Sequence, residues 1–163
     1  MKRQSKVEGR KSNAVASGSR HSTPATRHVT EVSAALIFRD GKLLITRRRP
    51  EAHLGGLWEF PGGKRELDET FEQCLVREIR EELGVEISVG KLFESVTHAY
   101  PEKTVHLKFF VCRLLGGEPQ PLGCKAVKWA GKSELADYEF PAADAKLLEK
   151  LRDALEFNPA RRD

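Results

Sequence analysis

The sequence predicts an α+β fold, an α/β/α sandwich in which a mixed β-sheet is packed between helices. Strand-like segments surround one well-delimited helix and precede a second helix near the C-terminus. The chain of 163 residues suits a single domain of ordinary size. Its content of 39% hydrophobic and 32% charged residues is typical of a soluble globular protein. Because no apolar run reaches the roughly 18 residues of a membrane helix, we expect no membrane partner.

The N-terminal segment differs in composition from the rest. Residues 1–30 contain seven basic residues and one acidic residue, a net charge of +6, so the remainder carries −2 of the chain's total of +4. The segment lacks aromatic residues and is rich in Ser, Arg, Ala and Thr, a composition that buries too little apolar surface to offset its ordering entropy. We therefore expect a disordered basic tail over residues 1–28, the domain over 29–157 and a short C-terminal tail over 158–163.

This tail is open to three interpretations: a solvated extension, an organelle transit peptide or an arm that binds polyanions. It has no apolar core of the kind that a secretory signal needs. Because the domain itself is slightly acidic, we expect no specific nucleic-acid partner. The three cysteines contain no C-x-x-C pair and leave an odd count for disulfides, which favours reduced thiols in the cytoplasm. The oligomeric state is left open.

The expected domain begins with a β-hairpin. The segment "VTEVSAALIF" is β-branched and apolar, "RDGK" contains the turn pair Asp40-Gly41, and "KLLITRRR" resumes a strand. A short segment around "LWEF" then enters a loop at Pro61-Gly62-Gly63, where glycines permit close approaches that a Cβ would prevent.

Capping signals at both ends predict a helix over residues 71–83. Thr70 is a suitable N-cap, Gln73 stands where a capping box needs it, and Gly84 suits a left-handed C-terminal stop. An apolar stripe along this helix predicts that one side faces the core. It is formed by Phe71, Leu75, Ile79 and Leu83.

Further strands and a terminal helix are expected after Gly84. The segments "VEISVGKLFESVTHAY", "KTVHLKFFVCRLL" and "KAVKW" have strand texture. A final helix is expected over residues 142–155, with leucines 147, 148, 151 and 155 along one side.

Three glutamates crowd one face of the first helix. At about 100° per residue, Glu78, Glu81 and Glu82 lie within an arc of about 100°, where like charges repel by about 0.2 to 0.5 kcal/mol per pair. A solvated charged face is the simplest interpretation. However, Glu69 and the carbonyl groups of Gly62 and Gly63 add oxygen donors nearby, and hard oxygens in that number suit Mg²⁺ or, as a substitute, Mn²⁺.

These residues resemble the Nudix box. Gly63, Glu69, Arg77-Glu78-Ile79, Glu81-Glu82 and Gly84-Val85 match all nine defined positions of that pattern across 23 residues. The resemblance implies Mg²⁺-dependent hydrolysis of a nucleoside diphosphate linked to another moiety. It also implies retained catalysis, because a nucleotide-sensing module that has lost activity, the non-enzyme alternative, is expected to have lost box acids.

The resemblance implies a role for each box residue. Glu78, Glu82 and the backbone oxygen of Gly62 look like metal ligands. Glu81 looks like a further ligand or a base that orients water. Arg77 is similar to the family arginine that orients a box glutamate, and Glu69 looks like the residue that holds the loop on the helix.

Around the box, "LLITRRRPEAHLGGLWEFPGGK" and "FPAADAKLLEKL" look like the MutT branch of nucleoside triphosphate pyrophosphohydrolases. This resemblance implies hydrolysis of 8-oxo-dGTP to 8-oxo-dGMP and pyrophosphate, a reaction that sanitises the nucleotide pool and protects DNA replication. Arg48 and His53 stand where MutT proteins approach the nucleotide, Phe60 where a ring packs near the base, and Asp144 where a side chain reads the base edge. Solvated arginines, a core phenylalanine, a loop histidine and an N-terminal helix charge are the structural alternatives.

The sequence departs from the MutT pattern at two places. Relatives can carry Asn where this chain has Asp144, and an ionised carboxylate only accepts hydrogen bonds. CTP, modified dCTP or general nucleoside triphosphates therefore stay open as substrates. In addition, Leu122-Gly123-Cys124 contains no acid where the family commonly supplies one, and Glu118 is the nearest. The chemistry then rests on the helix carboxylates alone or on a rearranged loop.

Overall fold

A computed structural model describes residues 28–154. The expected tails lie outside these residues apart from His28, and so do residues 155–157 of the expected domain. The strands are β1 (Val29–Arg39), β2 (Lys42–Arg47), β3 (Trp58–Glu59), β4 (Gly62–Lys64), β5 (Glu86–Ala99), β6 (Thr104–Gly116) and β7 (Ala126–Gly131). The helices are α1 (Phe71–Leu83) and α2 (Ala145–Asp153), with short 3₁₀ helices η1 (Lys132–Asp137) and η2 (Ala142–Asp144).

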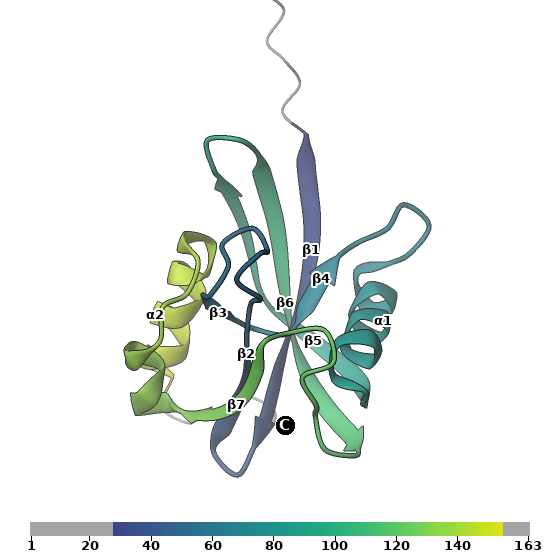
Figure 1. The fold of residues 1–163 in the computed structure, drawn as a ribbon, viewed down its shortest axis with the longest axis vertical. Coiled ribbons are helices and arrows are strands. Elements are labelled where there is room, and N and C mark those ends of the chain that lie inside the picture. The colour runs from purple at the N-terminus through teal and green to yellow at the C-terminus, as the bar shows by residue number, and fades with distance from the viewer. Residues whose placement is uncertain (1–27, 155–163) are drawn as a thin grey trace, which may run out of the picture.

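β1 lies at the centre of a mixed sheet. The strand order is β3-β2-β1-β6-β5, with β4 paired to β1 and β7 paired to β2. β1 runs parallel to β6 and antiparallel to β2 and β4. In Figure 1, α1 and α2 lie on opposite sides of these strands. The predicted α/β/α sandwich is therefore confirmed.

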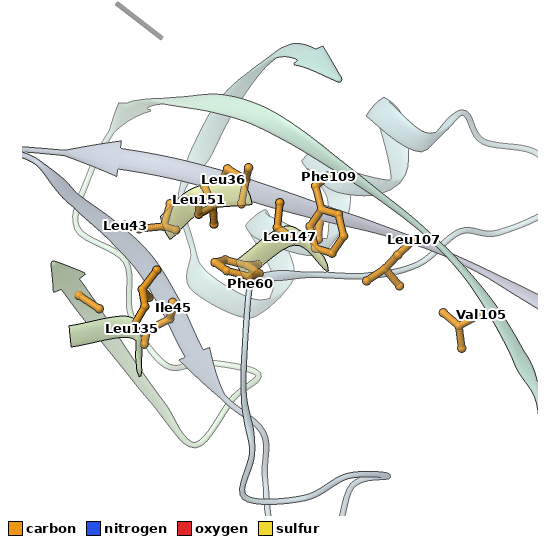
Figure 2. Close-up of a cluster of buried hydrophobic side chains, with 12 residues drawn as sticks. Leu36, Leu43, Ile45, Phe60, Val105, Leu107, Phe109, Leu135, Leu147 and Leu151 are labelled. Atoms are coloured by element: carbon orange, nitrogen blue, oxygen red, sulfur yellow. The ribbon is translucent and has the colours of Figure 1, made fainter. Parts of the chain in front are cut away.

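Successive residues of β1 face opposite helices. Ala34 and Leu36 belong to the buried cluster beneath α2, whereas Ala35 and Ile37 belong to the cluster beneath α1. A strand that is buried on both faces carries a continuous apolar run instead of an alternating one, which accounts for the sequence of β1. In Figure 2, side chains of the α2-side cluster gather around Phe60.

The β1–β2 hairpin and helix α1 are confirmed. Asp40 and Gly41 both have positive φ angles, 51° and 72°, as a tight hairpin turn with two left-handed residues requires. Thr70 and Gln73 form the predicted capping box, with hydrogen bonds of 2.9 and 3.1 Å. Gly84 ends α1 in the left-handed conformation at φ 68°. The caps fix both ends of the helix and hence the places of its glutamates.

Two local predictions were wrong, and one short helix was not predicted. The expected helix over residues 142–155 is instead η2 followed by α2, which ends at Asp153, and Leu155 lies outside the described residues. Asp144 is buried and its side chain makes no capping hydrogen bond, so the first turn packs inward instead of opening a regular helix. Residues 62–64 form a short strand on β1 where a loop was expected. The 3₁₀ helix η1 was not expected at all.

Within residues 28–154, no helix is both long and apolar enough to cross a membrane.

Candidate active site

A cavity of about 360 Å³ lies between α1, the central strands and η2. Seven of the residues predicted for the site line it: Arg48, His53, Phe60, Gly62, Glu78, Glu82 and Asp144. The other three, Glu69, Arg77 and Glu81, do not line it, and Arg77 forms ion pairs with both glutamates. The structure thus brings residues from both ends of the sequence to one cavity.

Arg77 joins the carboxylates of α1 to the loop before the helix. Its guanidinium donates to Glu69 at 2.6 and 3.0 Å and to Glu78 at 2.7 Å. It also donates to the backbone oxygen of Lys64 at 3.1 Å and to Glu81 at 3.4 Å. Planar, multidentate donation of this kind fixes carboxylate orientation, so Arg77 holds the rotamer of Glu78.

Glu69 closes the loop against the helix. Besides the bonds from Arg77, it accepts a hydrogen bond from the backbone N–H of Glu66 at 2.9 Å. The bonds from Arg77, followed by that from Glu66, lower the pKa of Glu69 to about 2. Glu69 is therefore ionised at neutral pH, and its hydrogen bonds hold the loop against α1.

The two glycines of the loop allow the backbone to lie against its neighbours. A Cβ on Gly63 would collide with the carboxylate of Glu78, and a Cβ on Gly62 would collide with the carbonyl oxygen of Ser33. The thiol of Cys74, 3.5 Å from the carbonyl oxygen of Gly63, supports the same loop from α1. This close approach brings loop carbonyls beside the carboxylates of α1.

Glu78 and Glu82 are partly removed from solvent in the cavity and lie close to other negative charges. Burial, then the neighbouring charges of Glu59 and Glu78, raise the pKa of Glu82 to about 8. Burial also raises the pKa of Glu78, against the opposing effect of Arg77. Two desolvated carboxylates that repel each other are the arrangement that a bound cation would relieve.

The donor set fits a divalent cation that keeps part of its water shell. Glu78, Glu82 and the backbone of Gly62 all line the cavity and offer hard oxygens. Within residues 28–154 no three His, Cys, Asp or Glu side chains are gathered into a preformed metal cage. An ion held by one or two carboxylates together with waters and substrate phosphates, as Mg²⁺ usually is, needs no such cage.

Glu59 is a cavity residue that the sequence analysis missed. It lines the cavity from β3, and its carboxylate accepts a hydrogen bond from Arg48 at 2.6 Å. Burial raises the pKa of Glu59, although Arg48 opposes the rise. A signal was present, because Glu59 is a charged residue between two aromatic ones, Trp58 and Phe60, in a strand-like segment.

The far end of the cavity is aromatic and contains Asp144. The ring of Phe60 stacks on Phe140 at a centroid distance of 5.3 Å and meets Phe109 edge-on at 6.0 Å. Asp144 is only 4% exposed. Burial, followed by the charge of Glu59, raises the pKa of Asp144 to about 7. Phe60 therefore serves both the core and the cavity, and Asp144 is partly protonated at neutral pH.

His53 joins two loops at the mouth of the cavity. Its Nε2 lies 3.4 Å from a carboxylate oxygen of Glu102, and its ring packs edge-on against Tyr100 at 6.2 Å. The hydroxyl of Tyr100 accepts a hydrogen bond from the backbone N–H of Ala143 at 3.3 Å. Lys103 and Tyr100 also line the cavity. They come from the β5–β6 turn, which no sequence signal linked to the site.

The loop after β6 brings no carboxylate to the cavity. Glu118 instead accepts two hydrogen bonds from Arg39, at 2.8 and 2.9 Å, on an exposed surface. The acids of the cavity are thus Glu78 and Glu82 of α1, Glu59 of β3 and Asp144 of η2.

Comparison with known proteins gives the same family throughout. Residues 33–150 match the NUDIX domain profile. The chain is 41% identical over 119 residues to the CTP pyrophosphohydrolase of Escherichia coli K12, a match that covers 73% of this chain and 88% of that protein. It is 34% identical over 113 residues to the 8-oxo-dGTP diphosphatase of the same organism, covering 69% and 88%. The solution structure of the E. coli ORF135 protein is similar with a TM-score of 0.67 at 39% identity, covering 79% of this chain and 94% of that one.

Proposed function

The chain belongs to the NUDIX domain family and is a Nudix-type hydrolase, and we propose that it cleaves nucleoside triphosphates to a monophosphate and pyrophosphate. One observation carries the proposal. The capped helix α1 presents Glu78 and Glu82 to a cavity that also contains Arg48 and an aromatic floor. Acidic ligands, a basic phosphate contact and a surface for a base are thus present in one cavity.

Nudix hydrolases generally need a divalent cation, and we propose Mg²⁺, with Mn²⁺ as a substitute. Glu78, Glu82 and the backbone oxygen of Gly62 would hold it. When bound, the ion neutralises phosphate charge and lowers the pKa of a coordinated water. Arg77 and Glu69 then act on the helix side by holding the carboxylate of Glu78 in place.

Basic residues that line the cavity would orient the phosphates. Arg48, Lys64 and Lys103 line the cavity, and a guanidinium or ammonium group within reach of a phosphate supplies charge-assisted hydrogen bonds. His53, whose backbone oxygen accepts a hydrogen bond from Arg48 at 2.6 Å, would keep Arg48 directed at the nucleotide.

Two acids are candidates for the base that orients the attacking water. Glu81 is the candidate from the box, but its side chain is 59% exposed and lies beside Arg77. Glu59 is the candidate from the structure, because it lines the cavity and its charge raises the pKa of Glu82. Comparing kcat of Glu59→Gln and Glu81→Gln identifies the base as the position with the larger loss.

Phe60 and Asp144 would select the nucleobase of the substrate. When protonated, the carboxyl group of Asp144 donates and accepts hydrogen bonds, as the amide of Asn does, which suits the oxidised guanine of 8-oxo-dGTP. When ionised it only accepts, which suits the amine of cytosine. A pKa of about 7 makes both forms available. The second candidate function, hydrolysis of CTP or modified dCTP, is favoured by the 41% identity to the CTP pyrophosphohydrolase.

The deciding experiment measures pyrophosphate release from a panel containing 8-oxo-dGTP, dGTP, CTP, 5-methyl-dCTP and ATP, with and without Mg²⁺. A clear preference for 8-oxo-dGTP supports nucleotide-pool sanitation as the function. Preference for a cytidine nucleotide supports the second candidate. Binding without turnover of any triphosphate contradicts the enzymatic proposal and supports a nucleotide sensor.

We further propose that the protein works in the cytoplasm, where nucleotide pools are sanitised. Cys74, Cys112 and Cys124 are buried and free. Unpaired thiols of this kind are typical of reducing compartments.

A further inference from the structure

The loop of residues 120–124 caps the C-terminal end of α1. The last carbonyl groups of a helix lack partners within the helix. Here the carbonyl oxygen of Glu82 accepts hydrogen bonds from the backbone N–H groups of Leu122 and Gly123, both at 3.0 Å. The carbonyl oxygen of Leu83 accepts one from Gln120, also at 3.0 Å. The backbone of Glu82 is therefore held by a segment that lies about forty positions later in the chain.

Gly123 also lies against the side chain of Glu82. A Cβ built on Gly123 would be 3.0 Å from Cγ, 3.1 Å from Cα and 3.3 Å from Cβ of Glu82. These distances are shorter than ordinary van der Waals contacts, so only a glycine lets the loop approach without moving Glu82. The loop thus fixes the first carbons of the side chain whose carboxylate enters the cavity.

Two contacts tie the same loop to the end of β2. Arg49 donates to the carbonyl oxygen of Leu122 at 3.0 Å, and the backbone N–H of Lys125 donates to the carbonyl oxygen of Arg47 at 2.8 Å. Between Arg47 and Arg49 stands Arg48, which lines the cavity. The loop therefore connects the strand end that carries Arg48 with the helix end that carries Glu82.

We propose that Gly123 and Arg49 are positioning residues, which set the place of the Glu82 carboxylate in the active site through the 120–124 loop. This loop supplies no acid of its own. Its contribution is to hold an acid of α1 from outside the cavity. The inference rests on the proposed function of Glu82 as a metal ligand, and it assigns a role to the segment where the family commonly supplies a further acid.

Gly123→Ala tests this role, with Gly116→Ala as the matched control, because a Cβ on Gly116 meets nothing within 4 Å. Residues that orient a ligand from outside typically contribute about 10- to 100-fold to metal affinity or activity. We expect Gly123→Ala to weaken Mn²⁺ binding by about tenfold, measured by electron paramagnetic resonance without nucleotide. We also expect kcat to fall by about tenfold while KM for the nucleotide and the midpoint of thermal unfolding stay near those of Gly116→Ala.

Arg49 provides a second, independent test. Arg49→Ala should weaken Mn²⁺ binding in the same direction, and Arg49→Lys should restore part of it because a lysine ammonium can still donate to the carbonyl of Leu122. Mn²⁺ binding and kcat unchanged in Gly123→Ala would overturn the proposal. A weaker Mn²⁺ binding and lower kcat that are accompanied by a clear fall in the midpoint of thermal unfolding relative to Gly116→Ala would also overturn it, since they would show a general structural role. If the parent binds Mn²⁺ but cleaves no triphosphate, the proposed function fails, while the Mn²⁺ comparison still decides the inference.

Discussion

The outer and inner carboxylates of the site are held in opposite ways. The outer cluster, Glu69 and Glu81 around Arg77, is paired with a guanidinium and does not line the cavity, and the pKa of Glu69 is lowered to about 2. The inner cluster, Glu59, Glu82 and Asp144, lines the cavity, where desolvation raises the pKa of all three groups. Arg48 is the cation that opposes the rise at each of them.

This contrast separates two tasks. Glu69, whose pKa is lowered, and Arg77, whose pKa is raised, keep their charges at neutral pH and can therefore act as a fixed frame. The inner cluster places three acids around one partly exposed cation, Arg48, so it gains stabilisation from any cation or proton that enters. A rigid frame around an incompletely neutralised interior is suited to a site that takes up an ion together with its substrate.

The largest expected effect comes from Glu78, which belongs to both parts because it contacts Arg77 and lines the cavity. Glu78→Gln keeps the shape and helix propensity of the side chain but removes the charge that a metal ion needs. We expect kcat/KM to fall by at least about 100-fold, with an unchanged far-ultraviolet circular dichroism spectrum. A variant that hydrolyses triphosphates at the parent rate would remove Glu78 from the ligand set.

Changing Arg77 breaks the outer cluster and the support of Glu78 without altering a side chain that lines the cavity. Arg77→Lys keeps a positive charge but cannot donate simultaneously to Glu69, Glu78 and the carbonyl of Lys64. We expect a loss of about 10- to 100-fold in kcat with a smaller change in KM. Steady-state kinetics at saturating Mg²⁺ measure this split. A change confined to KM would mean that Arg77 contributes to substrate binding instead of ligand orientation.

Changing Asp144 breaks the inner cluster with a smaller effect on turnover and a distinct effect on stability. Folding raises the pKa of Asp144 from 3.8 to about 7. Between these values the folded protein holds a proton that the unfolded chain has lost, so the free energy of unfolding falls as the pH rises from about 4 to about 7 and then levels off.

Asp144→Asn removes the titrating carboxyl group and, with it, this fall in the free energy of unfolding. We expect the midpoint of thermal unfolding to rise in the variant relative to the parent by roughly 5 to 10 °C more at pH 8 than at pH 5. Thermal melts of both proteins across this range measure the difference. Glu82, with its pKa raised to about 8, should leave part of the pH dependence in the variant. Parallel curves for the two proteins would show that Asp144 titrates normally.

The smallest expected effect comes from the mouth of the cavity, outside both clusters. Glu102→Gln removes the carboxylate that faces His53 at 3.4 Å, where both side chains are largely exposed. Exposed pairs of this kind contribute about 0.2 to 1 kcal/mol. We expect KM to change by less than about fivefold and kcat to stay constant. A large fall in kcat would instead assign the mouth contact to the catalytic step.

The helix that carries Arg77 and the site glutamates could be predicted from the sequence, because its determinants are local. Thr70, Gln73 and Gly84 fix the ends of α1, and the spacing of Glu78 and Glu82 follows from helical geometry. Strand texture and the Asp40-Gly41 turn similarly predicted the hairpin. In each case the residues that decide the structure are within a few positions of one another.

The inner cluster could be predicted only in part, because it depends on distant contacts. Glu59 enters the site through the pairing of β3 with β2, and Lys103 enters through the β5–β6 turn. The irregular start of the last helix follows from the burial of Asp144. The local pattern around Glu59, a charge between two aromatic residues, does not say which surface it meets, and the other two features have no local pattern at all.

The parallel pairing of β1 with β6 also sets an order in time. Val29 pairs with Thr104, 75 residues later, whereas α1 is complete by Leu83. A ribosome therefore synthesises the whole box helix, with both caps, before it reaches β6, the strand that completes the floor of the cavity. During that interval Leu75, Ile79 and Leu83 lack part of the apolar surface that buries them in the finished fold. A truncated chain that ends before β6 would therefore carry the complete box but would lack Val105, Leu107 and Phe109, which line the cavity.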